Sequence, residues 1–231
     1  FAPRAAHWPP FFFLVLLRQI LRMSSILLST AYFPPISWMA YVIQSESISI
    51  EIHETFPKQT YRNRCNIATA SGILGLTVPV KKTNGNHTKT EDILIDYSTN
   101  WQQLHWRSVV TAYNKSPYFL YYRDHLETIF DKKHQSLVEL NDELISLLLK
   151  LLGCHSKKLV YTREYFHQVE MADLRNTFHP KLNRADHNQV EMPRYIQVFE
   201  EKLGFIPDLS IIDLLFNLGP EAHDYLGKIK F

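Results

Sequence analysis

The chain has few cysteines and no apolar run long enough to cross a membrane. Its 231 residues include two cysteines, Cys65 and Cys154, so it lacks a disulfide framework and the cysteine pairs of a structural zinc site. The apolar run Phe11–Leu17 is shorter than the roughly 20 residues that span a bilayer. These absences predict a protein of the reducing cytoplasm without a membrane span.

No block of like charge is present either. The chain carries 25 basic and 23 acidic side chains, a net charge of +2. Three of the arginines lie in residues 1–22, which hold no acid, so the balance without them is 22 against 23, or −1. A basic surface that recruits nucleic acid is therefore not expected, and nucleic acid is not among the expected partners.

Residues 1–22 differ in composition from the rest of the chain. They begin without Met and combine arginines with a short apolar run. We interpret them as translated upstream sequence or a disordered N-terminus, with Met23 as the natural start. The alternative is an amphipathic membrane anchor, because Trp8, Phe11–Phe13 and the arginines suit a membrane interface. Residues 23–231 are expected to form one domain.

Periodicity predicts an α/β fold with a Rossmann-like opening unit, a mixed sheet and a helical C-terminal half. Ser25–Ala31 and Ser47–His53 are expected strands on either side of the helix-length segment Ile36–Gln44, an order typical of a βαβ unit with parallel strands. The polar segment Arg163–Met192 is expected to be a functional loop or a mobile linker. The further strands expected are Ile73–Val80, Asp92–Asp96 and Lys158–Thr162, and the helices expected are Trp101–Tyr113, Ser136–Leu152, Pro193–Leu203 and Ser210–Leu218.

A strongly polar segment, HETFPKQTYRNRCN, follows the alternating strand Ser47–His53. Mixed polar chemistry at a strand end is typical of a binding or catalytic site, because loops carry the chemistry and strands fix its geometry. Guanidinium and amide groups here suit a phosphate or carboxylate. The alternative is a solvated loop with surface salt bridges. The expected catalytic residues of the segment are His53 and Glu54, and the expected substrate-binding residues are Lys58, Tyr61, Arg62, Asn63 and Arg64.

His105 is a third expected catalytic residue. It lies on the apolar stripe of the predicted helix Trp101–Tyr113, where a hydrogen-bonded core histidine is the alternative, and an imidazole with a pKa near 6.5 is able to act as a base. No histidine shows metal-ligand spacing, so no metal is expected. Cys65 is expected to be structural rather than nucleophilic. The aromatic residues expected to stack on substrate, with a place in the core as the alternative, are Tyr32, Trp101 and Trp106.

In their order and spacing, several motifs resemble the WbqC-like protein family. The matching residues are Tyr32-Phe33-Pro34, Lys58, Tyr61, Asn63-Arg64, Thr77-Val78-Pro79-Val80, Trp101, His105, Tyr113 and Pro117-Tyr118-Phe119. The segments that resemble the Bacteroidetes-type branch are Asp173-Leu174-Arg175, His179-Pro180-Lys181, Phe205-Ile206-Pro207 and Leu209–Phe216. The chain departs from the family's pattern at Cys65 and at His53-Glu54.

The resemblance implies a bacterial role in O-antigen, lipopolysaccharide or related surface-polysaccharide synthesis, and for part of the family the transfer of glycine. It also implies that Arg175, His179 and Lys181 belong to the site, on a loop over an anionic small-molecule substrate such as a nucleotide-sugar, with a solvated loop as the alternative. We therefore expect a transferase that moves glycyl or another small acyl group to an amino sugar, with His105 or His53 as the base. The alternatives are nucleotidyl transfer on a nucleotide-sugar and a non-catalytic binding module. The sequence identifies no cofactor and no oligomeric state.

Overall fold

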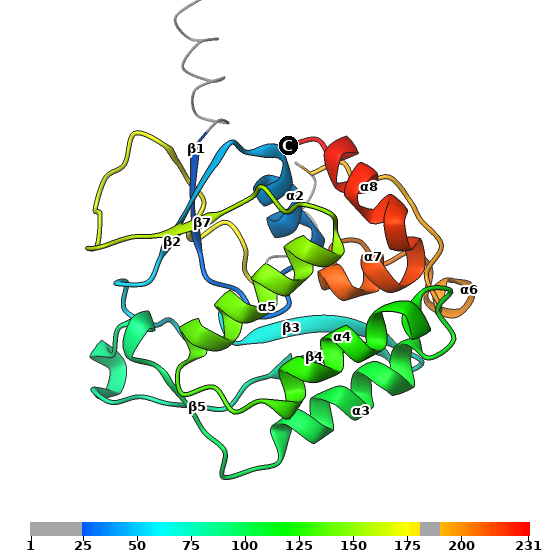
Figure 1. Cartoon of the computed structure of the whole chain (residues 1–231), viewed down its shortest axis with the longest axis horizontal. Helices are drawn as coiled ribbons and strands as arrows, with labels where there is room; N and C mark the ends of the chain where they lie inside the picture. The colour runs from blue at the N-terminus through cyan, green and yellow to red at the C-terminus, as the bar shows by residue number, and fades with distance from the viewer. Residues whose placement is uncertain (1–24, 181–189) are drawn as a thin grey trace, which may run out of the picture.

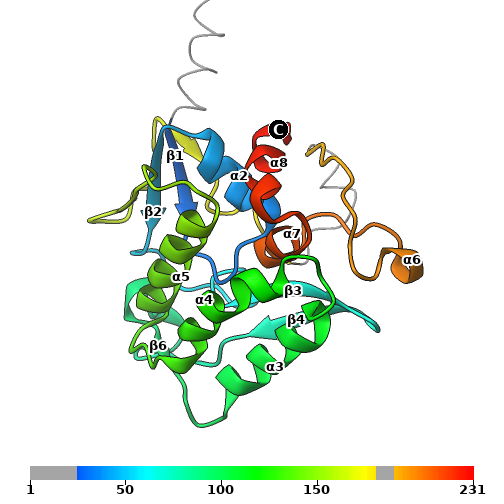
Figure 2. The same ribbon diagram turned by 45° about the vertical axis from the view of Figure 1, so that its right-hand side comes forward.

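The computed structural model of the chain describes residues 25–180 and 190–231, and every structural statement below concerns these residues. Lys181, one of the expected site residues, lies outside them. Figure 1 shows a parallel sheet beside helices α2, α7 and α8, with α5 crossing the middle of the molecule and the hairpin β3–β4 packed near α3 and α4. Figure 2 shows the same ribbon turned by 45° about the vertical axis.

The opening of the chain forms a parallel βαβ unit, which confirms the prediction. Strand β1 (Ser25–Ser29) leads into helix α2 (Ile36–Gln44) and then strand β2 (Ser47–Glu51). The two strands pair in parallel from Ser25 with Ser47 to Ser29 with Glu51. Their isoleucines and leucines are buried, so burial of both strands against the helices holds the register.

Two short strands complete this sheet in the order β7-β2-β1-β8. Strand β7 (Leu159–Tyr161) pairs in parallel with β2 and confirms the expected strand Lys158–Thr162 in shortened form. Strand β8 (Ala172–Asp173) pairs in parallel with β1. The sequence predicts a loop or linker for this part of the chain, because a strand of two residues exists only through its partner and leaves no periodic pattern. All four strands consequently end at the same edge of the sheet.

Two antiparallel pairs form a second layer. Strand β3 (Arg64–Thr69) and strand β4 (Gly72–Thr77) make a hairpin, and β5 (Val80–Lys81) pairs with β6 (Leu94–Ile95). Strand β4 confirms the expected strand Ile73–Val80 in shortened form, because Pro79 lacks a backbone N–H and β4 ends before it. The connection between β5 and β6 carries the 3-10 turns Gly85–His87 and Thr90–Asp92.

Three helices pack on these sheets. They are α3 (Trp101–Tyr113), α4 (Phe119–Asp131) and α5 (Leu137–Leu151). The bounds of α3 and α5 confirm the predicted helices, and α4 is an addition. Ser136 and Glu139 form a capping box at the start of α5. Within the described ranges, no helix combines the length and apolarity needed to cross a bilayer.

The C-terminal part holds α6 (Glu200–Leu203), α7 (Ile211–Leu218), the 3-10 turn Gly219–Glu221 and α8 (Ala222–Lys228). The prediction of α7 is confirmed. The helix expected over Pro193–Leu203 is wrong apart from its last turn, which is α6. The side chain of Gln197 bonds the backbone of Ile206, and the residues before α6 are not helical. Its amide nitrogen donates to the Ile206 carbonyl and its amide oxygen accepts from the Ile206 N–H. These side-chain bonds to the backbone compete with the local helical preference.

Candidate active site

The strand order places a crevice at the boundary between β1 and β8. The chain leaves β1 through α2 toward β2 on one side, whereas β8 lies on the opposite side of β1. Ligands of open α/β sheets bind outside the carboxyl ends of the strands at such a reversal of strand order. The polar residues gathered at this edge are Ser29, Glu51, Glu54, Arg62, Asp173 and Arg175, and we refer to them as the edge cluster.

Arg62 joins the segment after β2 to the end of β1. Its Nε donates to Glu54 Oε1 at 2.6 Å, and its Nη2 donates to Ser29 Oγ at 2.5 Å. Ser29 Oγ in turn donates to the backbone carbonyl of Arg175 at 2.9 Å. Arg62 is 3% exposed. A buried guanidinium needs such partners, because an unpaired charge in a low dielectric is strongly unfavourable.

Arg175 makes the matching set of contacts from the β8 side. Its Nε and Nη2 bind the two oxygens of Asp173 at 2.9 and 2.6 Å, a bidentate pair. Its Nη1 donates to the Phe166 carbonyl at 2.8 Å and lies 3.4 Å from Glu51 Oε2. The guanidinium holds the pKa of the Asp173 carboxyl below its usual range. Asp173 is therefore ionised at neutral pH, and its side chain is exposed.

Glu51 is the most deeply buried member of the edge cluster, with a residue exposure of 0%. Its Oε1 accepts from the His53 backbone N–H at 2.7 Å and from Thr162 Oγ1 at 3.0 Å. His53 itself lies beyond the end of β2, with Nδ1 2.8 Å from Glu91 Oε1 and Nε2 2.9 Å from the Thr162 carbonyl. Both partners of the ring are acceptors, so only a doubly protonated ring donates to both.

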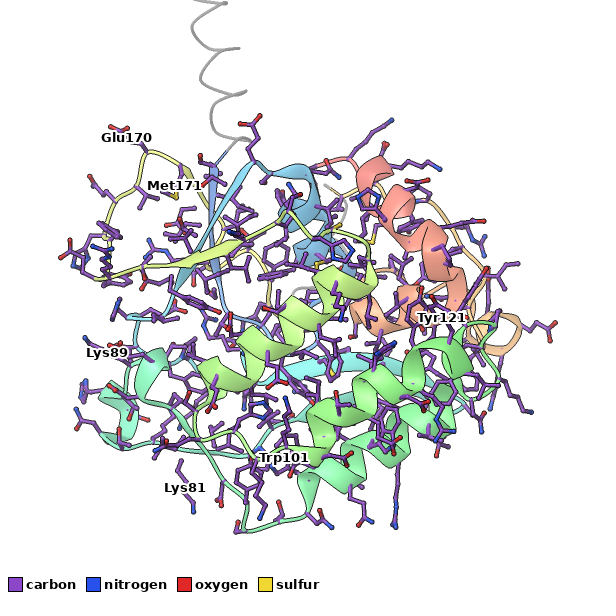
Figure 3. All side chains as sticks on the ribbon, in the orientation of Figure 1. Lys81, Lys89, Trp101, Tyr121, Glu170 and Met171 are labelled. Atoms are coloured by element: carbon purple, nitrogen blue, oxygen red, sulfur yellow. The ribbon has the colours of Figure 1, made fainter. Side chains whose placement is uncertain are left out.

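A small cavity of about 10 Å³ opens between the ends of β1 and β8. It has room for about one water molecule. Beside it, Tyr165 and Phe166 of the β7–β8 connection are partly exposed, and the Arg175 guanidinium lies 5.0 Å from the centre of the Tyr165 ring. The lining residues of the cavity are Ser29, Thr30, Ala31, Trp38, Tyr61, Arg62, Arg175 and Phe178. In Figure 3 the tip of this connection is marked by Glu170 and Met171.

Tyr32, Trp101 and His105 form an aromatic cluster, in which the ring centre of Trp101 lies 6.5 Å from that of Tyr32 and 5.2 Å from that of His105. In Figure 3 Trp101 lies away from the tip of the β7–β8 connection. The Tyr32 hydroxyl lies 3.0 Å from His105 Nδ1, and His105 also bonds the backbone of Thr77. Burial lowers the pKa of His105 from 6.5 to about 4, an effect that the Thr77 bond partly offsets. The ring is therefore neutral at physiological pH, and burial favours a structural role over the catalytic role that the sequence predicts.

The remaining expected site residues lie apart from one another. Lys58 is exposed, and Asn63 is buried with its amide donating to the Val78 carbonyl at 2.9 Å. Arg64 crosses the hairpin over Gly75, where an added Cβ would meet its Nη2 at 2.3 Å. Trp106 of α3 is partly buried and donates from its indole nitrogen to Glu127 of α4 at 2.7 Å. His179 follows Phe178 near the end of the first described range.

The structure thus brings together Glu54, Tyr61, Arg62 and Arg175 of the expected set. The sequence reasoning missed Ser29, Glu51 and Asp173 as site residues. The alternation gave no signal for Glu51, which shares the polar positions of the strand with Ser49 and His53 while the isoleucines keep their apolar spacing. Burial raises the pKa of the Cys65 thiol, in keeping with the structural role expected for it. In the described ranges, no group of three His, Cys, Asp or Glu side chains is arranged to hold a metal ion.

Comparisons with known proteins agree with the resemblance to the WbqC-like family. The model of the WbqC-like protein family matches residues 30–179, which include most of the edge cluster. The uncharacterized protein Rv1507c of Mycobacterium tuberculosis (strain ATCC 25618 / H37Rv) is 30% identical over 74% of this chain and 83% of its own length. No solved structure matches the chain.

Proposed function

This chain belongs to the WbqC-like protein family, and we propose that it is a cytoplasmic enzyme of bacterial surface-polysaccharide biosynthesis. In this proposal it transfers glycyl or another small acyl group to the amine of an amino sugar, and the reaction takes place at the edge cluster. The observation that carries the proposal is the pairing of Arg62 with Glu54 beside the crevice between β1 and β8. The C-terminal motifs support a place in the Bacteroidetes-type branch and a role in O-antigen synthesis.

The charge balance of the edge cluster favours an amine acceptor. Three carboxylates, Glu51, Glu54 and Asp173, face two guanidinium groups, so the cluster is net negative. A negative site attracts the ammonium form of an amino sugar. Because the pKa of Asp173 is held low by Arg175, this carboxylate stays charged at neutral pH and is exposed enough to meet the acceptor.

Glu54 and Arg62 supply the two groups that acyl transfer needs. The amine nitrogen attacks the acyl carbonyl carbon, a C–N bond forms, and the bond from that carbon to the donor's leaving group breaks. Before the attack Glu54 takes one proton from the bound ammonium group, which frees the nitrogen lone pair, and the second proton leaves with the departing group. Arg62 stabilises the negative charge on the carbonyl oxygen in the tetrahedral intermediate, which is commonly the larger contribution to catalysis.

Tyr165 and Phe166 would hold the sugar ring. Both are partly exposed, and the Phe166 carbonyl is fixed by Arg175. An aromatic ring provides an apolar surface for the C–H face of a sugar, while the carboxylates bind its polar edge. The loop residues His179 and Lys181 remain predicted contacts to an anionic part of a nucleotide-sugar.

The two histidines have less suitable surroundings for a base. His53 has an acceptor at each ring nitrogen, and His105 is buried in the aromatic cluster. In the proposal His53 positions Glu91 and the Thr162 carbonyl, which follows β7, through its two ring nitrogens. His105 positions the hydroxyl of Tyr32. Their catalytic roles remain predictions from the sequence, to be compared with Glu54 by substitution.

The proposal is tested by turnover. Purified protein is incubated with a panel of nucleotide-amino-sugars, with and without glycine and ATP. The masses of the products are measured by mass spectrometry. A glycine-sized mass increase on the sugar supports acyl transfer. Release of pyrophosphate with a new nucleotide-sugar supports the nucleotidyl alternative instead, and tight binding without any product supports a binding module.

A further inference from the structure

A groove of about 370 Å³ shares no lining residue with the edge cluster. It lies between the turn of the β3–β4 hairpin, the outer face of α3 and the segment just before α6. Its volume falls in the range of small-molecule sites. The apolar side chains that line it are Leu74, Leu104, Val198 and Phe199, with Ala70 and Ala112.

The hydroxyl groups on the walls of the groove are already used. Thr69 Oγ1 donates to the Gly72 carbonyl at 2.8 Å, Ser108 Oγ to the Leu104 carbonyl at 2.8 Å, and Thr111 Oγ1 to the Arg107 carbonyl at 2.7 Å. A hydroxyl that bonds its own backbone presents mainly its carbon atoms to a ligand. The walls are therefore more apolar than their residue types indicate.

The rim of the groove is cationic. Arg107 and Lys115 line it, and Lys202 reaches it by donating to the Ala70 carbonyl at 2.8 Å. The lining includes no carboxylate. Over residues 25–180 and 190–231, no ion pair joins Arg107 or Lys115 to an acid, although other surface cations such as Arg123 and Arg194 are paired.

We propose that this groove binds an anionic amphiphile with a single apolar chain, the chain lying between α3 and the hairpin and the anionic head contacting Arg107 and Lys115. Charge complementarity selects this occupant. An apolar wall of this size attracts any hydrophobic chain, whereas two unpaired cations at its rim stabilise a negative head group. Leu104, which is 64% exposed, has its side chain available for the apolar chain.

Three probes separate the two parts of this recognition. Dodecyl phosphate, used below its micelle concentration, carries both the apolar chain and the anionic head. Inorganic phosphate carries only the anion, and dodecyltrimethylammonium carries the same chain with a cationic head. Isothermal titration calorimetry of the full chain is expected to show binding of dodecyl phosphate at least about tenfold tighter than either of the other two.

Matched variants locate the site. Arg107→Gln and Leu104→Ser on α3 are each expected to weaken dodecyl phosphate binding about tenfold. Arg123→Gln, at a half-buried and ion-paired position, and Leu120→Ser, at an exposed position, remove the same residue types on α4 away from the groove, and they are expected to leave binding unchanged. All four side chains are surface groups, so circular dichroism is expected to show an unchanged fold.

Several outcomes would overturn the proposal. Equal binding of the cationic and anionic detergents would show that the groove makes only unspecific hydrophobic contact and does not recognise the anionic head. Equal losses in the α3 and α4 variants would place the amphiphile elsewhere on the surface. A dimer seen by analytical ultracentrifugation without ligand, and abolished by Leu104→Ser, would assign the groove to a second copy of the chain.

Discussion

The Arg62 guanidinium lies 2.6 Å from the Glu54 carboxylate, and both side chains are largely removed from solvent, with exposures of 4% and 11%. The pair joins the segment after β2 to Ser29 at the end of β1. A buried ion pair is rarely the most stable solution for a given space, because desolvation opposes the Coulombic gain. Its position at the crevice is consistent with a pair retained for chemistry.

The first prediction concerns the stability that depends on this pair. Arg62→Ala leaves the Glu54 carboxylate without its partner and Ser29 without a donor, so the free energy of unfolding is expected to fall by roughly 2–4 kcal/mol. Urea denaturation at pH 7 measures this change in the free energy of unfolding. Arg163→Ala, at an exposed position, is the control and is expected to change the value by less than about 0.5 kcal/mol. A similar small effect for both variants would show that Arg62 is not held as described.

His105 gives a prediction about pH. Its pKa is lowered from 6.5 to about 4 in the folded chain, so between these values the unfolded chain binds more protons. Stability is therefore present above pH 6.5 and is lost as the pH falls toward 4. Between pH 7 and pH 5 this group is expected to remove about 2 kcal/mol from the free energy of unfolding.

Urea denaturation of the unmodified chain and of His105→Gln at both pH values isolates this contribution. The variant is expected to show a smaller loss between pH 7 and pH 5. His125→Gln, at an exposed position, is the control, and it is expected to lose as much unfolding free energy between pH 7 and pH 5 as the unmodified chain. An identical pH dependence in the unmodified chain and His105→Gln would mean that His105 is accessible to protons in the folded state.

Two glycines near the C-terminus form a further matched pair. Gly219 has a φ of 55°, and a Cβ there would come within 2.5 Å of the Tyr118 ring, whereas Gly227 has open space. Gly219→Ala is expected to lower the free energy of unfolding by about 1–3 kcal/mol through overpacking and strain. Gly227→Ala, within α8, is expected to raise it by up to about 1 kcal/mol. Thermal unfolding of both variants checks this, and equal melting temperatures would contradict the close contact between α4 and the Gly219 turn.

The sequence predicted the elements that carry their own pattern. The βαβ opening, α3, α5 and α7 have apolar residues at strand or helix spacing, and local signals such as Ser136 before α5 mark their ends. Strand β8 depends on β1, which lies far away in the chain, and the segment around Gln197 depends on the side-chain bonds of Gln197 to the backbone of Ile206. Such partners are not visible in a single sequence, and there the predictions failed.

The candidate site likewise divides into residues that a local sequence pattern identifies and residues that only tertiary pairing brings to the site. Polar density after Ser47–His53 identified Glu54, Tyr61 and Arg62, which meet at the crevice. It did not separate them from Asn63, which bonds the Val78 carbonyl, and Arg64, which begins the hairpin strand β3, because the turn between β2 and β3 leaves no periodic pattern. Ser29 and Asp173 join the site through the parallel order of four strands, and that order follows from tertiary pairing.

The most direct test of the edge cluster as the catalytic site is the rate of acyl transfer to an amino sugar, measured per folded molecule in Glu54→Gln, His105→Gln and Glu46→Gln. Glu54→Gln keeps an acceptor for Arg62 and removes the base, so its rate is expected to fall about 100-fold or more. Glu46 is exposed, and its variant controls for loss of charge alone. The account predicts that Glu46→Gln and His105→Gln retain their rates. A full rate in Glu54→Gln together with a lost rate in His105→Gln would contradict it and move the site to the aromatic cluster of Tyr32, Trp101 and His105.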